Sequence, residues 1–397
     1  MKISAFTARR PIDQSMSTKF ADRFPSRRSQ LLVIAVFVVS FAAGCGSKPA
    51  RLPLIDPANF AGTAHDVIVA TNRRATDDPL LPFGDERSDS LSLNEVSVWV
   101  PADRKQGAIE YPSSAPDPET EFALTRFSPL NDSQLTEELN ERLAALVGEK
   151  QIFLFVHGYN VPYSNGVYRI GQMIEDFETN AVPVHFSWPS SGRTLGYLYD
   201  RDSVQFARDG LVEFLKLISK SDASSIFVMG HSMGTLLVME SLRQLSLSGE
   251  SDVLALISPL VLASPDIDVD VFRSQLNSLS ERPDPIVVFV ANDDGALKLS
   301  QTLRGGHPRV GEGKDIEVLQ EQGIAVIDLS EVDLGDGTQH SAFASSPTLI
   351  DIINQASAAR QTLVDADTRE ERSPLEDLSE FTKGLLYLPK KVLAPED

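Results

Sequence analysis

Apolar residues in the middle of the chain follow two alternating patterns. Continuous runs rich in β-branched and aromatic residues are typical of strands buried on both faces of a sheet, and they cover residues 152–156, 183–188, 226–229, 260–263, 286–290 and 324–329. Apolar residues three or four positions apart predict amphipathic helices, over residues 167–177, 204–218, 235–245, 271–279, 296–303 and 348–359. Because strands and helices alternate, we expect an α/β fold with a mostly parallel central sheet and helices on both faces.

The part of the chain before these repeats carries a weaker pattern. Short β-type runs at residues 67–71 and 96–100 predict two strands. The polar, turn-rich residues 77–90 between them predict a loop. Residues 102–131 hold four prolines and no periodicity, so we expect them to form a surface excursion.

Leucines at helical spacing predict a helix over residues 132–146, with Asp132 as its N-cap. We assign residues 63–360 to a single domain, in which residues 63–150 supply the N-terminal strands and the excursion. The charged residues 361–397 then form a C-terminal tail.

The first 44 residues have the features of a targeting segment. Two arginines precede an apolar run, residues 31–43, that is too short to cross a bilayer as a helix. A basic region, a short apolar run and small residues before a cleavage point are typical of a secretory signal peptide. We therefore expect residues 1–44 to be a signal peptide, in a precursor that starts at Met1 or at Met16.

Cys45 is the only cysteine of the chain and follows the apolar run directly. Its position after Ala42-Ala43-Gly44 resembles the lipobox of bacterial lipoproteins, whose cysteine becomes the lipidated first residue after cleavage. The resemblance implies a lipid anchor at Cys45, and hence a protein tethered in the cell envelope, at the outer membrane or the periplasmic face. Residues 45–62, rich in small residues and proline, predict a tether. The alternative is a plain signal peptide followed by an unmodified cysteine.

Charge and cysteine content exclude several classes of partner. The net charge is −20, and the first 44 residues carry +5, which leaves −25 on the rest of the chain. Because so acidic a body repels phosphate groups, we expect no nucleic-acid partner. A single cysteine allows neither an intramolecular disulfide nor a cysteine-based metal site.

One junction between a predicted strand and a predicted helix carries chemistry. Residues 230–234 read Gly-His-Ser-Met-Gly, the pattern G-x-S-x-G. In this context the pattern predicts a nucleophile elbow, in which Ser232 occupies a strained turn and Gly230 and Gly234 leave room for neighbouring backbone. The N-terminus of the helix directs peptide dipoles at a negative charge that forms beside Ser232. A strand-to-helix turn without chemistry is the alternative.

A serine nucleophile needs a histidine base and a carboxylate that orients the base. In a parallel sheet these residues come from the carboxyl ends of strands. Of the six histidines, only His340, in the loop after the last strand, fits the chain order Ser, Asp, His. The candidate acids are Asp294 and Asp293, which follow the strand at residues 286–290, and Asp266, which follows an earlier strand.

The remaining candidates concern the oxyanion hole and the rim of the site. The N–H of Met233 and the N–H of Tyr159, in the turn that follows an upstream strand, are the predicted oxyanion donors, and Gly158 lets the backbone approach. An ordinary turn is the alternative. Three aromatic residues near a Gly- and Pro-containing segment either line a pocket or pack beneath a loop: Trp188, Tyr197 and Tyr199.

Short segments between Val67 and Ala359 resemble a bacterial α/β-hydrolase family of unknown function, an esterase/lipase-like group. They include Ala70-Thr71-Asn72-Arg73, Val156-His157-Gly158-Tyr159-Asn160, Ser187-Trp188-Pro189-Ser190, Tyr199-Asp200-Arg201-Asp202-Ser203, Gly230-His231-Ser232-Met233-Gly234, Ser264-Pro265-Asp266, Asp294-Gly295-Ala296-Leu297, Pro308-Arg309-Val310-Gly311 and His340-Ser341. In the family's Asn-Asp-x-Ala-Leu pattern the aspartate corresponds to Asp294. The family's Gly-His-Ser reads Gln339-His340-Ser341 in this chain.

The resemblance implies an α/β-hydrolase fold with a triad of Ser232, Asp294 and His340. We expect a serine hydrolase that cleaves carboxylic esters through an acyl-enzyme, with no metal or cofactor. The expected partners are a small-molecule or lipid-like ester substrate and, through Cys45, a membrane. Thioester, amide and peptide cleavage use the same groups. The alternative function is a catalytically inactive hydrolase fold that serves as a binding module of the envelope.

Overall fold

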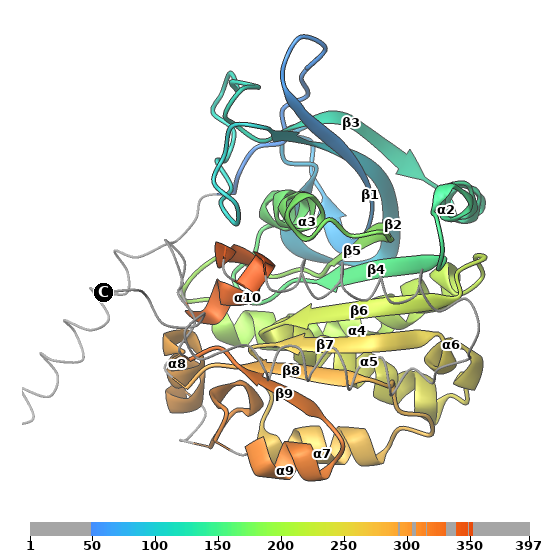
Figure 1. The fold of residues 1–397 in the computed structure, drawn as a ribbon, viewed down its shortest axis with the longest axis vertical. Helices are drawn as coiled ribbons and strands as arrows, with labels where there is room; N and C mark the ends of the chain where they lie inside the picture. Colours follow the sequence, from blue (N-terminus) through green and yellow to red (C-terminus); the bar gives the residue numbers. More distant parts are fainter. Residues whose placement is uncertain are drawn as a thin grey trace, which may run out of the picture. The chain divides into compact units, whose positions relative to one another are not determined.

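The computed structural model describes residues 49–351, apart from residues 293, 304–306, 315, 331–338 and 348. The predicted signal peptide, Cys45, the C-terminal tail and the alternative acid Asp293 lie outside the described residues. The elements below all belong to one unit of the chain, Ser47–Asp397, and Figure 1 shows their arrangement.

A nine-stranded sheet occupies the centre of the described part of the chain, in the order β3-β2-β1-β5-β4-β6-β7-β8-β9. Its strands are β1 (Gly62–Ala75), β2 (Phe83–Pro101), β3 (Ala123–Leu130), β4 (Gln151–Val156), β5 (Val182–Ser187), β6 (Ser225–His231), β7 (Ile257–Ala263), β8 (Ile286–Val290) and β9 (Ala325–Asp328). Neighbours from β1 to β9 pair in parallel. The two pairs at the β3 edge are antiparallel. The predicted α/β fold with a mostly parallel sheet is confirmed.

The antiparallel edge differs from the sequence-based prediction. β2 begins at Phe83, inside the loop expected over residues 77–90, and β3 lies within the excursion expected over residues 102–131. The first part of β2 forms a two-stranded ribbon with the end of β1, where Arg73 pairs with Arg87. Residues of this ribbon are mostly half-buried or exposed. The ribbon therefore lacks the alternation of apolar and polar residues from which a strand is predicted.

The helices that follow the strands pack on both faces of the sheet. They are α2 (Asp132–Ala145), α3 (Tyr163–Phe177), α4 (Tyr197–Ile218), α5 (Met233–Leu247), α6 (Ser251–Ala255), α7 (Val269–Asn277), α8 (Gly295–Leu303), α9 (Ile316–Glu321) and α10 (Ala342–Ser345). In the part of the chain that the structure describes, no helix is both long and apolar enough to span a membrane.

The N-cap of α2 is one residue earlier than predicted. Asn131, not Asp132, accepts a hydrogen bond from the backbone N–H of Gln134 at 3.0 Å. The Gln134 side chain in turn accepts a hydrogen bond from the Asn131 N–H at 3.0 Å. Together they form a capping box, which satisfies two backbone donors at the start of the helix.

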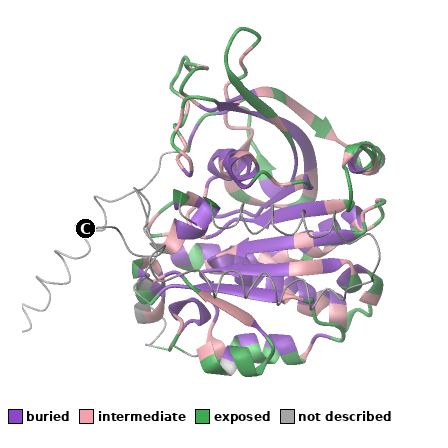
Figure 2. Cartoon of the chain, in the orientation of Figure 1, coloured by how far each residue is buried: buried purple, intermediate pink, exposed green. Residues whose placement is uncertain are grey.

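Two apolar clusters, one on each face of the sheet, make up the core. Along β4, Ile152, Leu154 and Val156 belong to the cluster that packs against α2, α4, α5 and α7. Phe153 and Phe155 belong to the other cluster, with α3 and α10. The two faces of one strand therefore support opposite layers, and Figure 2 shows the central strands buried.

Residues 50–55, within the segment predicted as a tether, pack against the domain. The side chains of Ala50 and Leu52 are buried. Backbone hydrogen bonds join Leu52 N–H to Leu80 O at 2.9 Å and Ile55 N–H to Leu124 O at 2.8 Å. Alternating burial of small and apolar residues, which composition alone does not reveal, attaches this segment to the folded unit.

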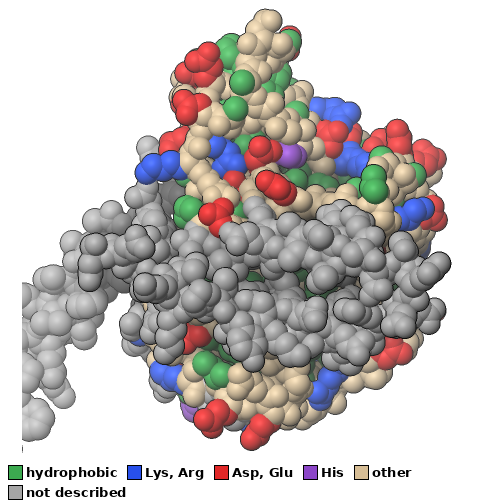
Figure 3. Space-filling view, in the orientation of Figure 1, with side chains coloured by type: hydrophobic (Ala, Val, Ile, Leu, Met, Phe, Trp, Pro, Cys, Tyr) green, Lys and Arg blue, Asp and Glu red, His purple; other side chains and the backbone are tan. Residues whose placement is uncertain are grey.

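Charged side chains remain on the surface. Figure 3 shows Asp and Glu side chains interspersed with Lys and Arg over the described part of one face. A few charged residues are nevertheless buried. Those that lie near the carboxyl ends of the strands are described next.

Candidate active site

Ser232 lies at the junction of β6 and α5 in a strained backbone conformation. Its φ is 51° and its ψ is −122°, a region that residues with a side chain rarely adopt. The Ser232 N–H donates to Ala263 O of β7 at 2.8 Å, and its carbonyl accepts from the Thr235 hydroxyl at 2.6 Å. These bonds hold the turn in place. The Ser232 hydroxyl makes no capping hydrogen bond to α5, although serine is a favoured N-cap.

The glycines on either side of Ser232 are required by close backbone approach. A Cβ on Gly234 would lie 2.7 Å from Val156 O and would also meet the His157 carbonyl. A Cβ on Gly230 would lie 3.1 Å from Thr235 Cα. The predicted reason for the two glycines of G-x-S-x-G therefore holds in this structure.

The structure brings Asp294 and His340 together. The His340 Nδ1–H donates to Asp294 Oδ2 at 2.7 Å, with Asp294 fully buried and His340 partly exposed. The other Asp294 oxygen accepts from the N–H groups of Ala296 and Leu297, at 2.9 and 3.1 Å, at the start of α8. Burial acts to raise the pKa of Asp294, but the hydrogen bonds and charge of His340 and the two backbone donors outweigh it, so the pKa lies below its ordinary value.

His340 is bound to His231, the residue that precedes Ser232. The His231 Nε2–H donates to His340 O at 2.8 Å, and the two imidazole rings lie 4.8 Å apart. The ring of Phe343 also packs against the His231 ring, with the two centroids 4.7 Å apart. Burial lowers the pKa of His231 to about 3, so this imidazole is neutral at pH 7 and keeps the Nε2 proton that it donates.

The structure describes both His340 and Ser232, and it has no hydrogen bond between the imidazole and the hydroxyl. Such bonds are often long in ligand-free enzymes and shorten when substrate binds. Because Nδ1 of His340 is engaged by Asp294, the remaining nitrogen, Nε2, is the one free to accept a proton.

The alternative acid, Asp266, has other partners. Its carboxylate accepts from the Tyr197 hydroxyl at 2.8 Å and from the Ser300 hydroxyl at 2.5 Å, and Arg309 Nε lies 3.4 Å away. Its N–H donates to Ser232 O at 3.3 Å. Asp266 therefore supports the backbone of the serine turn and does not contact His340. Of the candidate acids that the structure describes, Asp294 alone bonds to the histidine.

The two predicted oxyanion donors belong to segments that adjoin the serine, α5 and the turn after β4. Met233 is the first residue of α5, where backbone N–H groups have no partner within the helix. Gly158 brings the β4 turn against the serine, since a Cβ on Gly158 would lie 2.9 Å from Ser232 Cβ. Tyr159 follows directly, and its phenol donates to Arg193 O at 3.2 Å and to Thr194 O. Met233 therefore follows the serine in the chain, and Tyr159 follows the glycine that packs against the serine. Their role as oxyanion donors stays a prediction.

A buried carboxylate, Asp200 at the start of α4, holds this turn. Its oxygens accept from the Asn160 N–H at 3.1 Å, the Ser191 N–H at 2.7 Å and the Ser190 hydroxyl at 2.6 Å. Asn160 has a φ of 60°, which such a bond helps to maintain. Burial raises the pKa of Asp200, and the three hydrogen bonds oppose this. Asp200 thus joins the loops that follow β4 and β5.

Arg73, a buried residue of β1, also binds the loops that follow β4 and β5. Its guanidinium donates to Val161 O at 2.8 Å, Ser190 O at 3.0 Å and Gly84 O at 3.0 Å. Burial lowers the pKa of Arg73 to about 10, so the guanidinium is still charged at neutral pH. The nearby charge of Asp200 opposes the effect of burial and favours the charged form. A planar guanidinium can satisfy several carbonyls at once, which explains why Arg and not Lys occupies this position.

The aromatic residues near β5 pack within the protein. Trp188 is fully buried, stacks on His157 with ring centroids 4.9 Å apart, and donates from its Nε1–H to His157 O at 2.7 Å. Tyr197 is buried against Asp266. Tyr199 lies at the surface with the Arg87 guanidinium over its ring. Of the two interpretations of these aromatics, packing describes Trp188 and Tyr197.

A family model described as "Alpha/beta hydrolase of unknown function" matches residues 131–359, more than half of the chain. The matched region includes the serine turn, Asp294 and His340. The chain belongs to this family of α/β hydrolases.

A curated relative of this α/β hydrolase is an uncharacterized protein of Nostoc sp. (strain PCC 7120). It is 29% identical over a match that covers 24% of this chain and 32% of that protein. The chain thus spans about a third of the length of the curated relative it matches.

Solved structures similar to this α/β hydrolase include two esterases. Esterase B from Lactobacillus rhamnosis has a TM-score of 0.35 and 10% identity, and the match covers 86% of this chain and 98% of that one. An esterase of Pyrobaculum calidifontis has a TM-score of 0.33 and 11% identity, with 85% and 92% covered.

Sequence reasoning predicted Ser232, Asp294 and His340 as site residues but gave no role to Arg73 and Asp200. The family resemblance included both residues. An aspartate in the first turn of a helix reads as an ordinary cap, and an arginine in a polar strand end reads as a surface residue. Arg73 binds Val161, 88 residues away in the chain, and Asp200 binds Asn160, 40 residues away, in addition to Ser190 and Ser191.

Proposed function

We propose that this protein is a serine hydrolase that cleaves carboxylic esters. The observation that supports the proposal most strongly is the Asp294–His340 pair, in which the carboxylate is buried and the histidine is bonded to His231, the residue before a serine in a strained turn. The pair supplies an oriented base, and the turn presents a hydroxyl at the N-terminus of a helix.

In the proposed reaction, His340 Nε2 takes the proton of Ser232 while the serine oxygen attacks the acyl carbon of the ester. The N–H groups of Tyr159 and Met233 bind the oxyanion of the tetrahedral intermediate. The alcohol leaves with the proton from His340, and an acyl-enzyme on Ser232 remains. Water then attacks the acyl-enzyme by the same route and releases the acid, and Asp294 stabilises the imidazolium in both steps.

A labelling and turnover experiment tests the proposal. A fluorophosphonate probe labels the wild type and not Ser232→Ala, and turnover of p-nitrophenyl butyrate falls by at least about a thousandfold in His340→Ala. His307→Ala is the matched control, since His307 is exposed. Wild-type protein that neither reacts with the probe nor turns over the ester contradicts the proposal and favours a binding module.

The type of bond that is cleaved needs its own test, because the same catalytic groups attack thioesters and amides. A panel of p-nitrophenyl esters, acyl thioesters and anilides with equal acyl chains separates these classes by their kcat/KM. We expect the ester to have the highest value.

We also propose that a lipid at Cys45 anchors the protein in the cell envelope, on the basis of the apolar run and the lone cysteine that follows it. Metabolic labelling with an alkyne fatty acid is expected to mark the wild type and not Cys45→Ser. Equal labelling of both proteins, or of neither, contradicts the anchor.

A further inference from the structure

A small pocket adjoins the serine turn on the α3 side of the sheet. Its volume is about 180 Å³, and its walls include Gly158, Asn160, Arg169, His231 and Phe343. Gly158 approaches Ser232 closely, as described above, so the pocket begins beside the serine. At about 30 Å³ for one water molecule in the liquid, this volume suits a chain of a few carbon atoms rather than a drug-sized ligand.

Arg169 of α3 carries the only formal charge among the described residues that line the pocket. Burial lowers the pKa of His231 to about 3 and also lowers the pKa of His157, so both are neutral at pH 7. The other lining residues are apolar, amide, hydroxyl or glycine. The pocket therefore presents one cation in mostly apolar walls.

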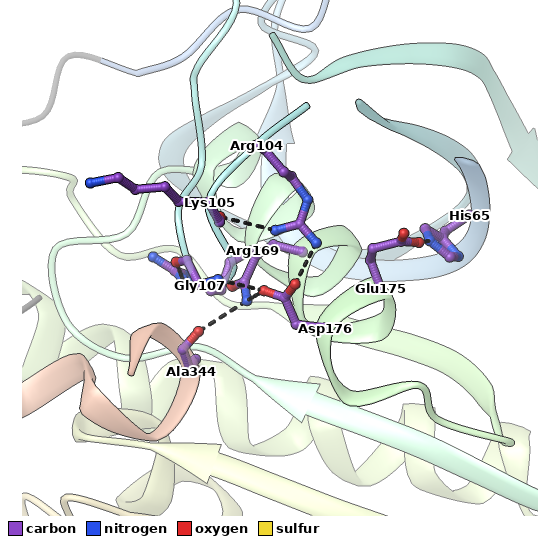
Figure 4. A network of polar contacts seen from close by, with 9 residues as sticks. His65, Arg104, Lys105, Gly107, Arg169, Glu175, Asp176 and Ala344 are labelled. Atoms are coloured by element: carbon purple, nitrogen blue, oxygen red, sulfur yellow. Dashed lines mark hydrogen bonds and ion pairs between the residues drawn. The ribbon is translucent and has the colours of Figure 1, made fainter. Parts of the chain in front are cut away.

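No carboxylate among the described residues forms an ion pair with Arg169. Its Nη1 donates to Gln172 Oε1 at 2.6 Å and to Gly107 O at 3.5 Å, both neutral acceptors. The nearby carboxylate of Asp176 is bound by Arg104, by the Gly107 N–H at 2.8 Å and by the side-chain amide of Gln172, and its charge acts on Arg169 without a direct bond. Figure 4 shows Arg104 and Asp176 directed toward each other, with Arg169 beside them.

A half-buried guanidinium without a carboxylate partner costs free energy of desolvation that a bound anion would recover. Because guanidinium groups bind carboxylates in a bidentate manner, the chemistry of the pocket matches a carboxylate at the end of a short apolar chain. Gly158, in the pocket wall, precedes Tyr159, the proposed donor to the acyl carbonyl. The acyl chain is thus the part of an ester that extends into the pocket.

We propose that the substrates are esters whose short acyl chain ends in a carboxylate, and that Arg169 binds this carboxylate. This inference rests on the proposed esterase function. It adds the substrate class and a residue that determines it.

Paired substrates test the inference. The ratio of kcat/KM for mono-p-nitrophenyl adipate to that for p-nitrophenyl hexanoate compares acyl chains of equal length with and without the carboxylate. We expect this ratio to fall at least about tenfold in Arg169→Gln and to recover in part in Arg169→Lys. Arg273→Gln is the matched control, because Arg273 lies at the surface of α7. Spontaneous hydrolysis is subtracted with Ser232→Ala.

A ratio that is unchanged in Arg169→Gln overturns the inference while the esterase activity stands. Failure of the wild type to cleave either ester overturns the esterase function instead. In that case binding decides the inference: monomethyl adipate is expected to raise the Tm of Ser232→Ala and not that of Ser232→Ala with Arg169→Gln. Absence of that difference overturns the proposed carboxylate site.

Discussion

Asp294 and His340 are 46 residues apart in the chain, yet the His340 Nδ1–H donates to the Asp294 carboxylate at 2.7 Å. The strand order explains the meeting. β8 and β9 are parallel neighbours, so the residues that follow them emerge at the same edge of the sheet. The lowered pKa of Asp294 keeps the carboxylate ionised at neutral pH, which fixes the proton of His340 on Nδ1.

The first prediction concerns that tautomer. Asp294→Asn removes the charge and reverses the hydrogen bond, so the imidazole presents the wrong nitrogen to the serine. We expect kcat for p-nitrophenyl butyrate to fall by up to about ten-thousandfold, with near-native circular dichroism. Asp270→Asn, at an exposed position of α7, is the control. A kcat within about threefold of the wild type contradicts the assigned role of Asp294.

The second prediction concerns the space beside the serine turn. Gly234→Ala puts a Cβ against the carbonyls of Val156 and His157 and is expected to lower the free energy of unfolding by about 1–3 kcal/mol. Gly210→Ala in α4 is the matched control, because the nearest atoms to its Cβ would be those of Asn72, at 3.4 Å or more, and alanine favours the helix by about 1 kcal/mol. Urea denaturation of both variants measures the difference. Equal midpoints contradict the close approach.

The third prediction concerns the carboxylate that holds the loops after β4 and β5. Asp200→Ala leaves three donors without an acceptor, each of which costs about 1–3 kcal/mol when buried. We expect lower stability and, because the turn carries the proposed oxyanion donor Tyr159, a lower kcat. Asp209→Ala, on the same helix but exposed, is expected to change neither. Loss of stability with an unchanged kcat would show that Asp200 stabilises the loops but does not affect catalysis.

The parallel part of the fold was predictable because its strands are continuous apolar runs. β4, β6 and β8 are buried on both faces, and each run is bounded by turn residues. The serine turn was predictable because one backbone geometry demands two glycines at fixed spacing. The Asp294–His340 pair followed from the order of residues along the chain together with the family resemblance.

The N-terminal edge was not predictable from the pattern of residues. The first half of β2 pairs only with the end of β1, outside the apolar core, so its polar residues carry no signal of a strand. The buried Arg73 and Asp200 were equally hidden. Charged residues are rarely buried without partners, and their partners become apparent only when the loops after β4 and β5 are placed together.

The last prediction concerns pH and stability. His185 in β5 is fully buried, and burial lowers its pKa to about 3, against an unfolded value of about 6.5. Between these values the unfolded chain binds a proton that the folded chain does not. The free energy of unfolding is therefore at its full value above about pH 6.5 and decreases as the pH falls toward 3. From pH 6.5 to 5 this one residue accounts for about 2 kcal/mol.

His185→Asn tests this contribution, because asparagine retains a donor for Phe155 O, which His185 Nδ1 contacts at 3.0 Å, but does not titrate. We expect the loss of stability between pH 7 and pH 5, measured by urea denaturation, to be smaller in this variant by about 2 kcal/mol. His307→Asn, at an exposed position, is expected to retain the wild-type slope. Parallel pH profiles for the wild type and His185→Asn would show that folding does not lower the pKa of His185.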